Sequence, residues 1–290
     1  MGAMLPMDGH VHSEWSWDTT SGSMERTCSR AVELGLPAVA FTEHADPGGW
    51  LVLASDLDDY PHLKEFVTPD RTPGDPVGGT LRPPNLDVDG YMESVQRCRE
   101  RFPDLRILTG VELGEPHRDP EGVARLLASG SFDRLLGSLH SLPDGGDYSE
   151  MPNLFRQRRP ADVIRDYLAE LMNLIKGSDV FDVLGHIDYP LRYWPASAEP
   201  FRVGAFEEEF RQVLRVLAGT GRALEVNTRG DFPVAVVVWW RAEGGDAITF
   251  GSDAHAASGL GRGFATATAM VAAAGFQPDS RPLDPWRALR

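Results

Sequence analysis

Two histidines separated by one residue stand near the amino terminus, in the segment DGHVHS at residues 8–13. Side chains of a β-strand alternate between its two faces, so His10 and His12 would point to the same side. Two imidazoles placed in this way can bind one metal ion, and imidazole suits Zn, Fe and Ni. Because a lone His-x-His pair is more often a pair of surface histidines, this interpretation depends on the rest of the chain.

Further histidines and acids occur where five other apolar runs end. They are His44 in FTEH, Glu112 in GVE, His140 in GSLH, His186 in GHID, and Asp253 with His255 in GSDAH. Buried charges and imidazoles are costly unless they are paired or bind a metal. Any one of them could be a hydrogen-bonded core histidine or a helix-capping acid. Their recurrence at six of seven apolar runs instead predicts one shared metal site.

The apolar runs predict seven β-strands, and the stretches between them predict helices. The strands are expected at residues 7–12, 37–42, 106–113, 133–139, 180–185, 222–227 and 247–252. The helices are expected at residues 23–34, 87–102, 120–128, 160–175, 203–218, 233–242 and 259–274. Repeated alternation of strand and helix is typical of parallel strands joined by helical crossovers. We therefore expect an α/β protein.

The predicted connections differ in length according to their direction. Helix-to-strand connections are short, whereas the strand-to-helix connections at 44–87, 140–159 and 186–202 are long. In a parallel barrel, all strand-to-helix loops emerge at the carboxyl ends of the strands, where active sites lie. The long loops and the candidate ligands are therefore expected on the same face of the protein.

Residues 45–86 are rich in Pro, Gly and Asp, and long ordered loops of this kind are usually lids or insertions. A flexible linker between two domains is the alternative, but the alternation of strand and helix resumes after this segment. We therefore expect a loop insertion at 45–86 within a single domain that spans residues 1–290. The Pro-rich tail at 277–290 is expected to be irregular.

The net charge of −15 argues against a nucleic acid polymer as partner, because neutralising phosphates requires clustered Lys and Arg. It allows a small phosphorylated metabolite held by one or two arginines. Cys28 and Cys98 are the only cysteines and are expected to be reduced. No apolar run reaches the length of a membrane span, and the first residues lack the features of a signal peptide. We expect a cytoplasmic protein without a membrane partner; the oligomeric state stays open.

The candidate ligands outnumber what one ion needs, since catalytic Zn typically takes three protein ligands and a water. Eight are named above, and Asp18, in a loop six residues after His12, is a candidate ninth whose role the pattern leaves open. Two to three divalent transition-metal ions (Zn, Mn or Fe) are therefore expected. Glu112 is the natural bridge between ions, because its two oxygens can reach two of them.

The motifs GHVHS, TEH, GVE, GSLH, GHID and GSDAH, in this order over residues 7–270, resemble those of the polymerase-and-histidinol-phosphatase (PHP) superfamily. The resemblance implies a distorted (β/α)7 TIM-like barrel with a trinuclear metal site at the carboxyl ends of the strands. It also implies that Asp18 is the third ligand of the first motif. The segments LDVDGYMESVQRCRERF, LLGSLHSL and GHIDYPLRY are similar to monofunctional histidinol-phosphate phosphatases.

Arginines that could bind a phosphate group occur in three places. Arg192, in the loop that follows His186, is the strongest candidate, and the resemblance also favours an arginine there. A second set could form a phosphate clamp or a simple charged loop: Arg156, Arg158 and Arg159. Arg262 is more typical of a solvent-exposed residue at the start of a helix.

Together these features predict a metal-dependent phosphomonoesterase. Bound ions would activate water and neutralise charge on the phosphate oxygens, while Arg192 grips the phosphate. Asp253 or a nearby histidine such as His255 would assist proton transfer to the leaving group. L-Histidinol phosphate is the expected substrate, with Glu115 as an acidic loop residue that meets its amine and imidazole. The alternatives are a nucleotide or other small phosphorylated metabolite, or a non-catalytic PHP-like binding domain, which the presence of all nine ligands disfavours.

Overall fold

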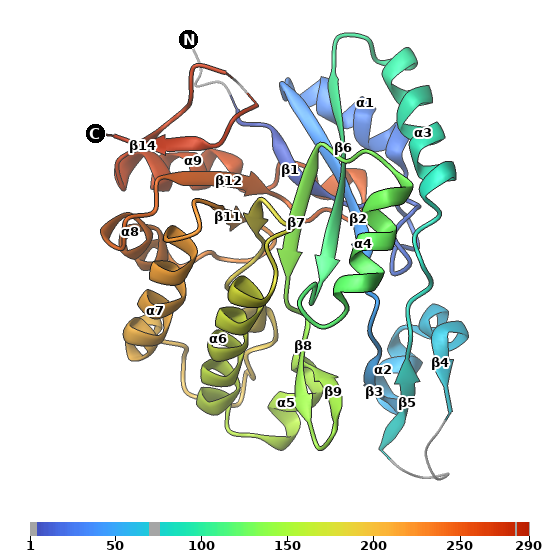
Figure 1. The fold of residues 1–290 in the computed structure, drawn as a ribbon, viewed down its shortest axis with the longest axis vertical. Coiled ribbons are helices and arrows are strands. Elements are labelled where there is room, and N and C mark those ends of the chain that lie inside the picture. Colours follow the sequence, from blue (N-terminus) through green and yellow to red (C-terminus); the bar gives the residue numbers. More distant parts are fainter. Residues whose placement is uncertain (1–4, 70–75, 282, 290) are drawn as a thin grey trace.

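The fold is organised around a sheet that contains seven parallel strands in chain order (Figure 1). The computed structural model describes residues 5–69, 76–281 and 283–289. Each neighbouring pair of these seven strands is parallel, as the alternation of strand and helix predicts. The strands are β1 (Asp8–Val11), β2 (Ala38–Ala45), β6 (Arg106–Gly114), β7 (Arg134–Ser138), β10 (Val183–Leu184), β11 (Ala223–Asn227) and β12 (Ala247–Gly251). All seven predicted strands are present, although β10 is shorter than expected.

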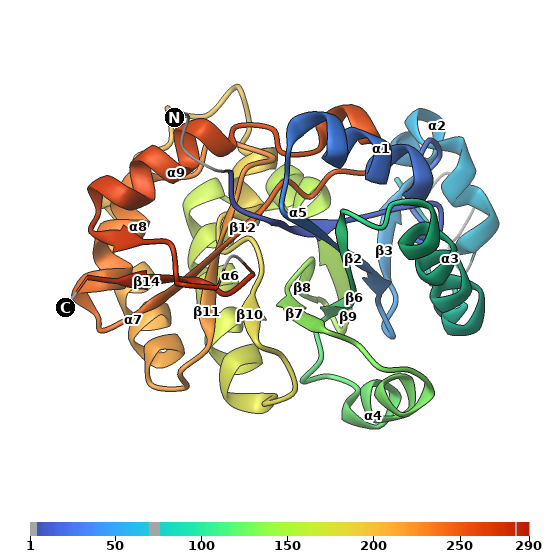
Figure 2. The same cartoon turned by 90° about the horizontal axis from the view of Figure 1, so that it is seen from above.

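Helices surround the curled sheet and connect its strands (Figure 2). They are α1 (Met24–Leu34), α3 (Val88–Arg101), α4 (Pro120–Ser129), α6 (Pro160–Gly177), α7 (Glu207–Ala218), α8 (Val234–Ala242) and α9 (Phe264–Ala273). The helix predicted at 203–218 is divided into a 3-10 turn, η3 (Val203–Phe206), and α7. The helix predicted from residue 259 begins only at Phe264, because Gly261 and Gly263 have φ angles of 64° and 70°. Left-handed residues of this kind cannot belong to a right-handed helix.

A hydrophobic core packs the helices against the sheet. On α6, the apolar stripe at helical spacing is fully buried, and it consists of Val163, Tyr167, Leu171 and Leu174. Residues of β1, β2, β10, β11 and β12 belong to the same core cluster. The core therefore holds the strands in position, and the candidate ligands lie at the ends of these strands.

The first and last parallel strands approach each other at their carboxyl ends. Val11, at the end of β1, forms an isolated parallel bridge with Ala254, which follows β12. The amide of Asp253 donates to the carbonyl of His10 at 2.8 Å, and that of His12 donates to Ala254 at 2.9 Å. These bonds hold the two candidate-ligand motifs of β1 and β12 beside each other.

A second sheet covers the region beyond the carboxyl ends of β6 and β7 (Figure 1). Its strands come from the two long loops at 44–87 and 140–159, for which the sequence analysis predicts no regular structure. Its strands, in spatial order, are β4 (Val67–Thr68), β5 (Val77–Leu81), β3 (Trp50–Leu53), β9 (Asp147–Glu150) and β8 (Ser141–Asp144). The short helices α2 (Ala54–Asp59), η1 (Pro61–Phe66) and α5 (Met151–Gln157) lie in the same two loops. Residues 70–75 of the expected insertion lie outside the described residues.

The tail at 277–290 is not irregular throughout, contrary to expectation. Residues Trp286–Ala288 form β14, which pairs antiparallel with β12 and with β13 (Phe276–Gln277). Pro285 precedes this strand of three residues, so proline's missing donor removes no hydrogen bond from either pairing. Residues 282 and 290 of this tail lie outside the described residues.

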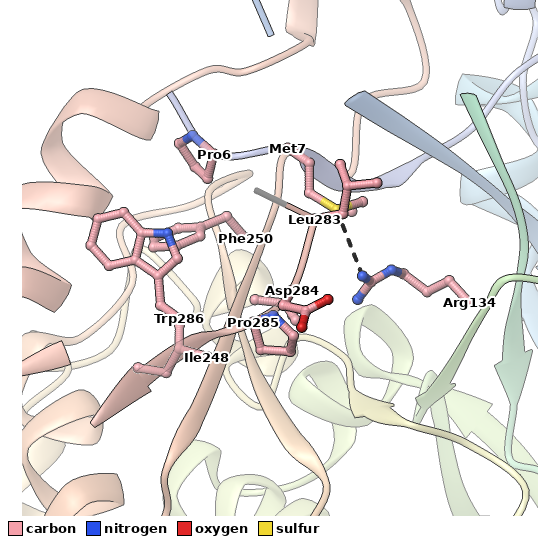
Figure 3. A pocket seen from close by; sticks show the side chains of 11 residues that line it. Pro6, Met7, Arg134, Ile248, Phe250, Leu283, Asp284, Pro285 and Trp286 are labelled. Atoms are coloured by element: carbon pink, nitrogen blue, oxygen red, sulfur yellow. Dashed lines mark hydrogen bonds between the residues drawn. The ribbon is translucent and has the colours of Figure 1, made fainter. Parts of the chain in front are cut away.

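The amino-terminal end of the main sheet is packed with apolar side chains. A small cavity there is lined by Met7, Phe250, Leu283 and Trp286 together with Arg134, whose Nη2 donates to the Met7 sulfur at 3.7 Å (Figure 3). None of the candidate ligands lines it, so the chemistry is expected at the opposite end of the strands. Within the described part of the chain, no helix has the length and apolarity needed to cross a membrane.

Candidate metal centre

The carboxyl ends of six parallel strands bring all nine predicted ligands into one cluster. β1 and the turn after it carry His10, His12 and Asp18, while β2 carries His44 and β6 carries Glu112. His140 follows β7, His186 follows β10, and Asp253 and His255 follow β12. In a parallel sheet these ends lie at one edge, which explains why residues far apart in sequence meet here.

Glu112 lies at the centre of this cluster and faces five imidazoles. Its Oε1 lies 2.6 Å from Nε2 of His186 and 3.2 Å from Nε2 of His140. Its Oε2 lies 3.2, 3.3 and 3.2 Å from one ring nitrogen of His10, His12 and His44, respectively. The two oxygens of one carboxylate therefore address two separate sets of histidines, which is the arrangement expected of a bridging ligand.

Asp18 joins a second group of ligands at the open side of the cluster. Its Oδ2 lies 2.9 Å from Nε2 of His255 and 3.5 Å from Nε2 of His44. Nitrogens of His12, His44 and His255 lie within 4.8 Å of one another. The structure thus places Asp18 beside His44 and His255, the two residues that share this group with His12.

A third group contains His10, His186 and Asp253, whose potential ligand atoms also lie within 4.8 Å of one another. Asp253 has a φ of 52°, a left-handed conformation that is uncommon outside glycine. Its carboxylate lies between two arginines, with Arg192 Nη1 2.7 Å from Oδ2 and Arg229 Nη1 3.0 Å from Oδ1. Arg192 is therefore at the site, as predicted, and its Nη2 donates to Asn227.

Buried acids outside the ligand set fix which nitrogen of each imidazole faces the centre. His10 Nδ1 lies 2.8 Å from Oε1 of Glu225, and a carboxylate can only accept, so Nδ1 carries the proton. His12 Nδ1 lies 2.9 Å from the hydroxyl of Ser16, which donates to Glu43 at 2.6 Å. In both arrangements Nδ1 is held by an acceptor and Nε2 is directed at the ligand cluster, as in metal sites where the second nitrogen is held in this way.

Asp46 positions His140 in the same way and also lies near His44. Its Oδ1 lies 3.3 Å from Nδ1 of His140, its Oδ2 lies 3.5 Å from Nδ1 of His44, and Trp17 donates to Oδ2 at 2.9 Å. The sequence reasoning missed Asp46, although His44-x-Asp46 repeats the spacing of His10 and His12. It also missed Glu225 on β11, the one strand to which no site residue was assigned. An acid inside the apolar run RALEVN was the available signal.

The electrostatics of the cluster favour cations. Burial alone would raise the pKa of Glu112, but His10, His44 and His140 hold it well below its ordinary value. Burial opposes ionisation of Asp253 as well, yet Arg192 and His10 lower its pKa strongly. His186 shows the opposite balance, because burial lowers its pKa to about 4 and leaves a neutral imidazole that can act as a ligand.

The donor set fits metal ions. The Nε2 atoms of His10 and His12 lie only 3.1 Å apart, so a proton or a metal ion must separate their lone pairs. Several buried side-chain atoms lack a hydrogen-bond partner within the described chain, among them Glu112 Oε2, Asp18 Oδ1 and His44 Nδ1. Unsatisfied buried polar atoms are costly, and metal coordination removes that cost. Histidine nitrogens combined with carboxylate oxygens suit Zn, Mn and Fe.

The remaining sequence candidates are engaged elsewhere. Arg156 pairs with Asp56, Arg158 with Asp144, and Arg159 with Asp162. These three are therefore surface ion pairs, and Arg262 is exposed. Glu115 lies beside His140, and its Oε1 accepts hydrogen bonds from the amides of His140 and Ser141. One oxygen of Glu115 thus orders the backbone beside His140, and its contact with a substrate stays a prediction.

Comparison with known proteins agrees with this geometry. Residues 8–229 match the PHP domain family. The chain is 25% identical over 284 residues to a histidinol-phosphatase of Lactococcus lactis subsp. lactis, covering 94% of this chain and 93% of that protein. It is 26% identical over 276 residues to a protein of Deinococcus radiodurans named as a probable histidinol-phosphatase, covering 91% and 92%.

The fold is also similar to a solved structure of this kind. That crystal structure is of histidinol phosphate phosphatase from Lactococcus lactis complexed with Zn, L-histidinol and phosphate, with a TM-score of 0.76 and 23% identity. The similarity covers 98% of this chain and 99% of that one. Because the family match spans most of the chain and includes seven of the nine candidate ligands, the protein belongs to the PHP domain family.

Proposed function

We propose that this protein is a metal-dependent phosphatase that hydrolyses L-histidinol phosphate to histidinol and phosphate. The observation that carries the proposal is the Glu112 carboxylate, which faces five imidazoles at the carboxyl ends of the strands. The names of the relatives from Lactococcus lactis and Deinococcus radiodurans support the substrate.

We further propose that the seven parallel strands form a distorted (β/α)7 barrel within a single domain. The bridge between Val11 and Ala254 supports closure between the first and last parallel strands. In such a barrel the metal centre lies at the carboxyl-terminal mouth.

Two to three divalent ions are proposed for the cluster. The supporting observation is that the ligand atoms fall into overlapping groups that share Glu112, His10, His12 and His44. The full proposed ligand set is His10, His12, Asp18, His44, Glu112, His140, His186, Asp253 and His255. When bound, such ions lower the pKa of water and neutralise charge on phosphate oxygens.

The chain's own residues supply phosphate binding and proton transfer. Arg192 and Arg229 both lie beside Asp253, so a phosphate bound there would meet two guanidinium groups. Both side chains contact Asp253 in this structure, and a cation on Asp253 would compete with them and leave their donors for the phosphate. His255, whose Nδ1 lies 2.9 Å from Arg229 Nη1, and Asp253 are the groups positioned to pass a proton to the leaving oxygen.

Replacing Glu112 by alanine should remove more than one metal ion per chain, because both oxygens of the bridge are lost. The measurement is elemental analysis after reconstitution with Zn or Mn, compared with the wild-type protein. Glu121→Gln is the control, since Glu121 is exposed in the first turn of α4. Full metal content in Glu112→Ala would show that Glu112 is not the bridge.

The reconstituted enzyme should hydrolyse L-histidinol phosphate with a higher kcat/KM than simple sugar phosphates or adenosine monophosphate. The assay is phosphate release across this panel of esters with Mn, Zn or Fe. A higher kcat/KM for the nucleotide would replace histidinol phosphate as the proposed substrate. No turnover of any ester by the metal-loaded protein would favour a binding domain.

Replacing Arg192 by alanine should raise KM and lower kcat/KM while metal content stays intact. Loss of a charge-assisted hydrogen bond to phosphate costs about ten- to a hundred-fold in kcat/KM. Lysine at this position should restore only part of the loss, because it keeps the charge but not the planar fork. Arg159→Ala is the control, as Arg159 is exposed. A kinetically silent Arg192→Ala would place the phosphate elsewhere.

A further inference from the structure

A partly buried carboxylate outside the ligand set lies beside the metal centre. Glu150 ends β9 and pairs with Ser141 of β8, which directly follows His140. Residues directly opposite each other in an antiparallel pair point to the same face of the sheet. The Glu150 side chain therefore lies on the same face of the second sheet as the Ser141 hydroxyl. This places it next to His140, a predicted metal ligand.

Glu150 differs from the other acids of these loops because it has no partner. Asp56 pairs with Arg156, Asp144 pairs with Arg158, and Glu115 accepts backbone hydrogen bonds. The Glu150 carboxylate forms no hydrogen bond or ion pair with any residue that the structure describes. A carboxylate kept without a counter-ion in a partly buried place is costly, and a cationic ligand would remove that cost.

The charges around Glu150 lead to the same conclusion. Burial raises the pKa of Glu150 to about 7, His140 lowers it, and the carboxylates of Asp46, Asp56 and Glu115 raise it further. Acids thus surround this group, and no lysine or arginine among the described residues forms an ion pair with it. Arg118, which donates to the Ser141 hydroxyl, pairs with Glu170 instead. An ammonium or imidazolium group brought by a ligand would be attracted to this region.

Two tyrosines of η2 (Tyr189–Tyr193) form an aromatic wall beside the candidate metal centre. The ring of Tyr189 lies 5.2 Å from that of His140 and 5.0 Å from that of His186. The Tyr193 ring lies 5.4 Å from that of Tyr189 and remains partly exposed. Burial raises the pKa of both tyrosines, and the charge of Glu150 raises both pKa values further. Aromatic faces of this kind bind imidazoles and ammonium groups well.

The same wall reaches the proposed phosphate site. The guanidinium of Arg192 lies 5.1 Å from the centre of the Tyr189 ring. The same guanidinium forms the ion pair with Asp253. Tyr189 is therefore in contact with the arginine that we assign to phosphate and also lies within the influence of Glu150. A small molecule with a phosphate at one end and a cation at the other could lie along this ring.

We propose that Glu150, together with Tyr189 and Tyr193, binds the positively charged amine and the imidazole of the substrate, and so selects phosphate esters that carry a cation. This inference rests on the proposed function and gives Glu150 the role that the sequence assigned to Glu115. Glu150 is not one of the proposed metal ligands, so its removal should change substrate choice without changing metal content.

The test compares Glu150→Gln with the wild-type protein, both reconstituted with the same metal, on two esters. L-Histidinol phosphate carries a cation, and p-nitrophenyl phosphate does not. The substitution should lower kcat/KM for histidinol phosphate at least about tenfold, with kcat/KM for p-nitrophenyl phosphate unchanged within about twofold. Inhibition by L-histidinol should weaken in parallel, and elemental analysis should give the wild-type metal content. Asp147→Asn, an exposed site on the same strand, should leave both rates unchanged.

Equal losses on the two esters would overturn the proposal, since they would show a structural role for Glu150. Unchanged discrimination between the esters would overturn it as well. The comparison does not depend on which ester the wild-type protein prefers. If another ester proves to be the better substrate, the proposed function fails, while a loss of preference for the cationic ester in Glu150→Gln would still support the site.

Discussion

A buried carboxylate surrounded by imidazoles is the interaction on which the rest of this structure depends. The side chain of Glu112 is almost fully buried, and five histidines place a ring nitrogen within 3.3 Å of it. Such a cluster is stable only if cations lie between the donors, because an isolated buried charge and facing lone pairs are both costly. Metal ions bound at the two oxygens of Glu112 would satisfy this requirement with the candidate ligands already in place.

The surrounding protein serves to hold that cluster in one arrangement. Glu225 and the pair of Ser16 with Glu43 fix the outer nitrogens of His10 and His12, and Asp46 does the same for His140. These acids are buried, so their hydrogen bonds act in a region of low polarity where they are strong. The parallel strands and their helices then set where these groups stand, and the second sheet brings Glu150 and its neighbours to the same end.

Much of this could be predicted from the sequence, because two independent sequence signals coincide at the end of each strand that carries a candidate ligand. An apolar run identifies each parallel strand, and a histidine or acid at its end identifies the functional face, so all seven strands and all nine clustered residues were found. Asp46 and Glu225 were missed because a buried acid that supports a ligand has the same sequence pattern as one capping a helix or lying in a loop. The pairing of Leu51 with Ser149 joins two loops about a hundred residues apart, and short strands without alternation give no local signal for it. The short strand β14 was missed because the three prolines that precede it, Pro278, Pro282 and Pro285, resemble an irregular tail.

The most direct test of the account is to locate the ions by anomalous diffraction at the Zn absorption edge, using crystals of the Zn-reconstituted protein. The account predicts more than one anomalous peak at the carboxyl ends of the strands, with at least one ion at each oxygen of Glu112. One set of ligands should include His140 and His186, and the other should include His10 and His12. A fully loaded protein with no peak at Glu112, or with a single ion bound away from these histidines, would contradict it.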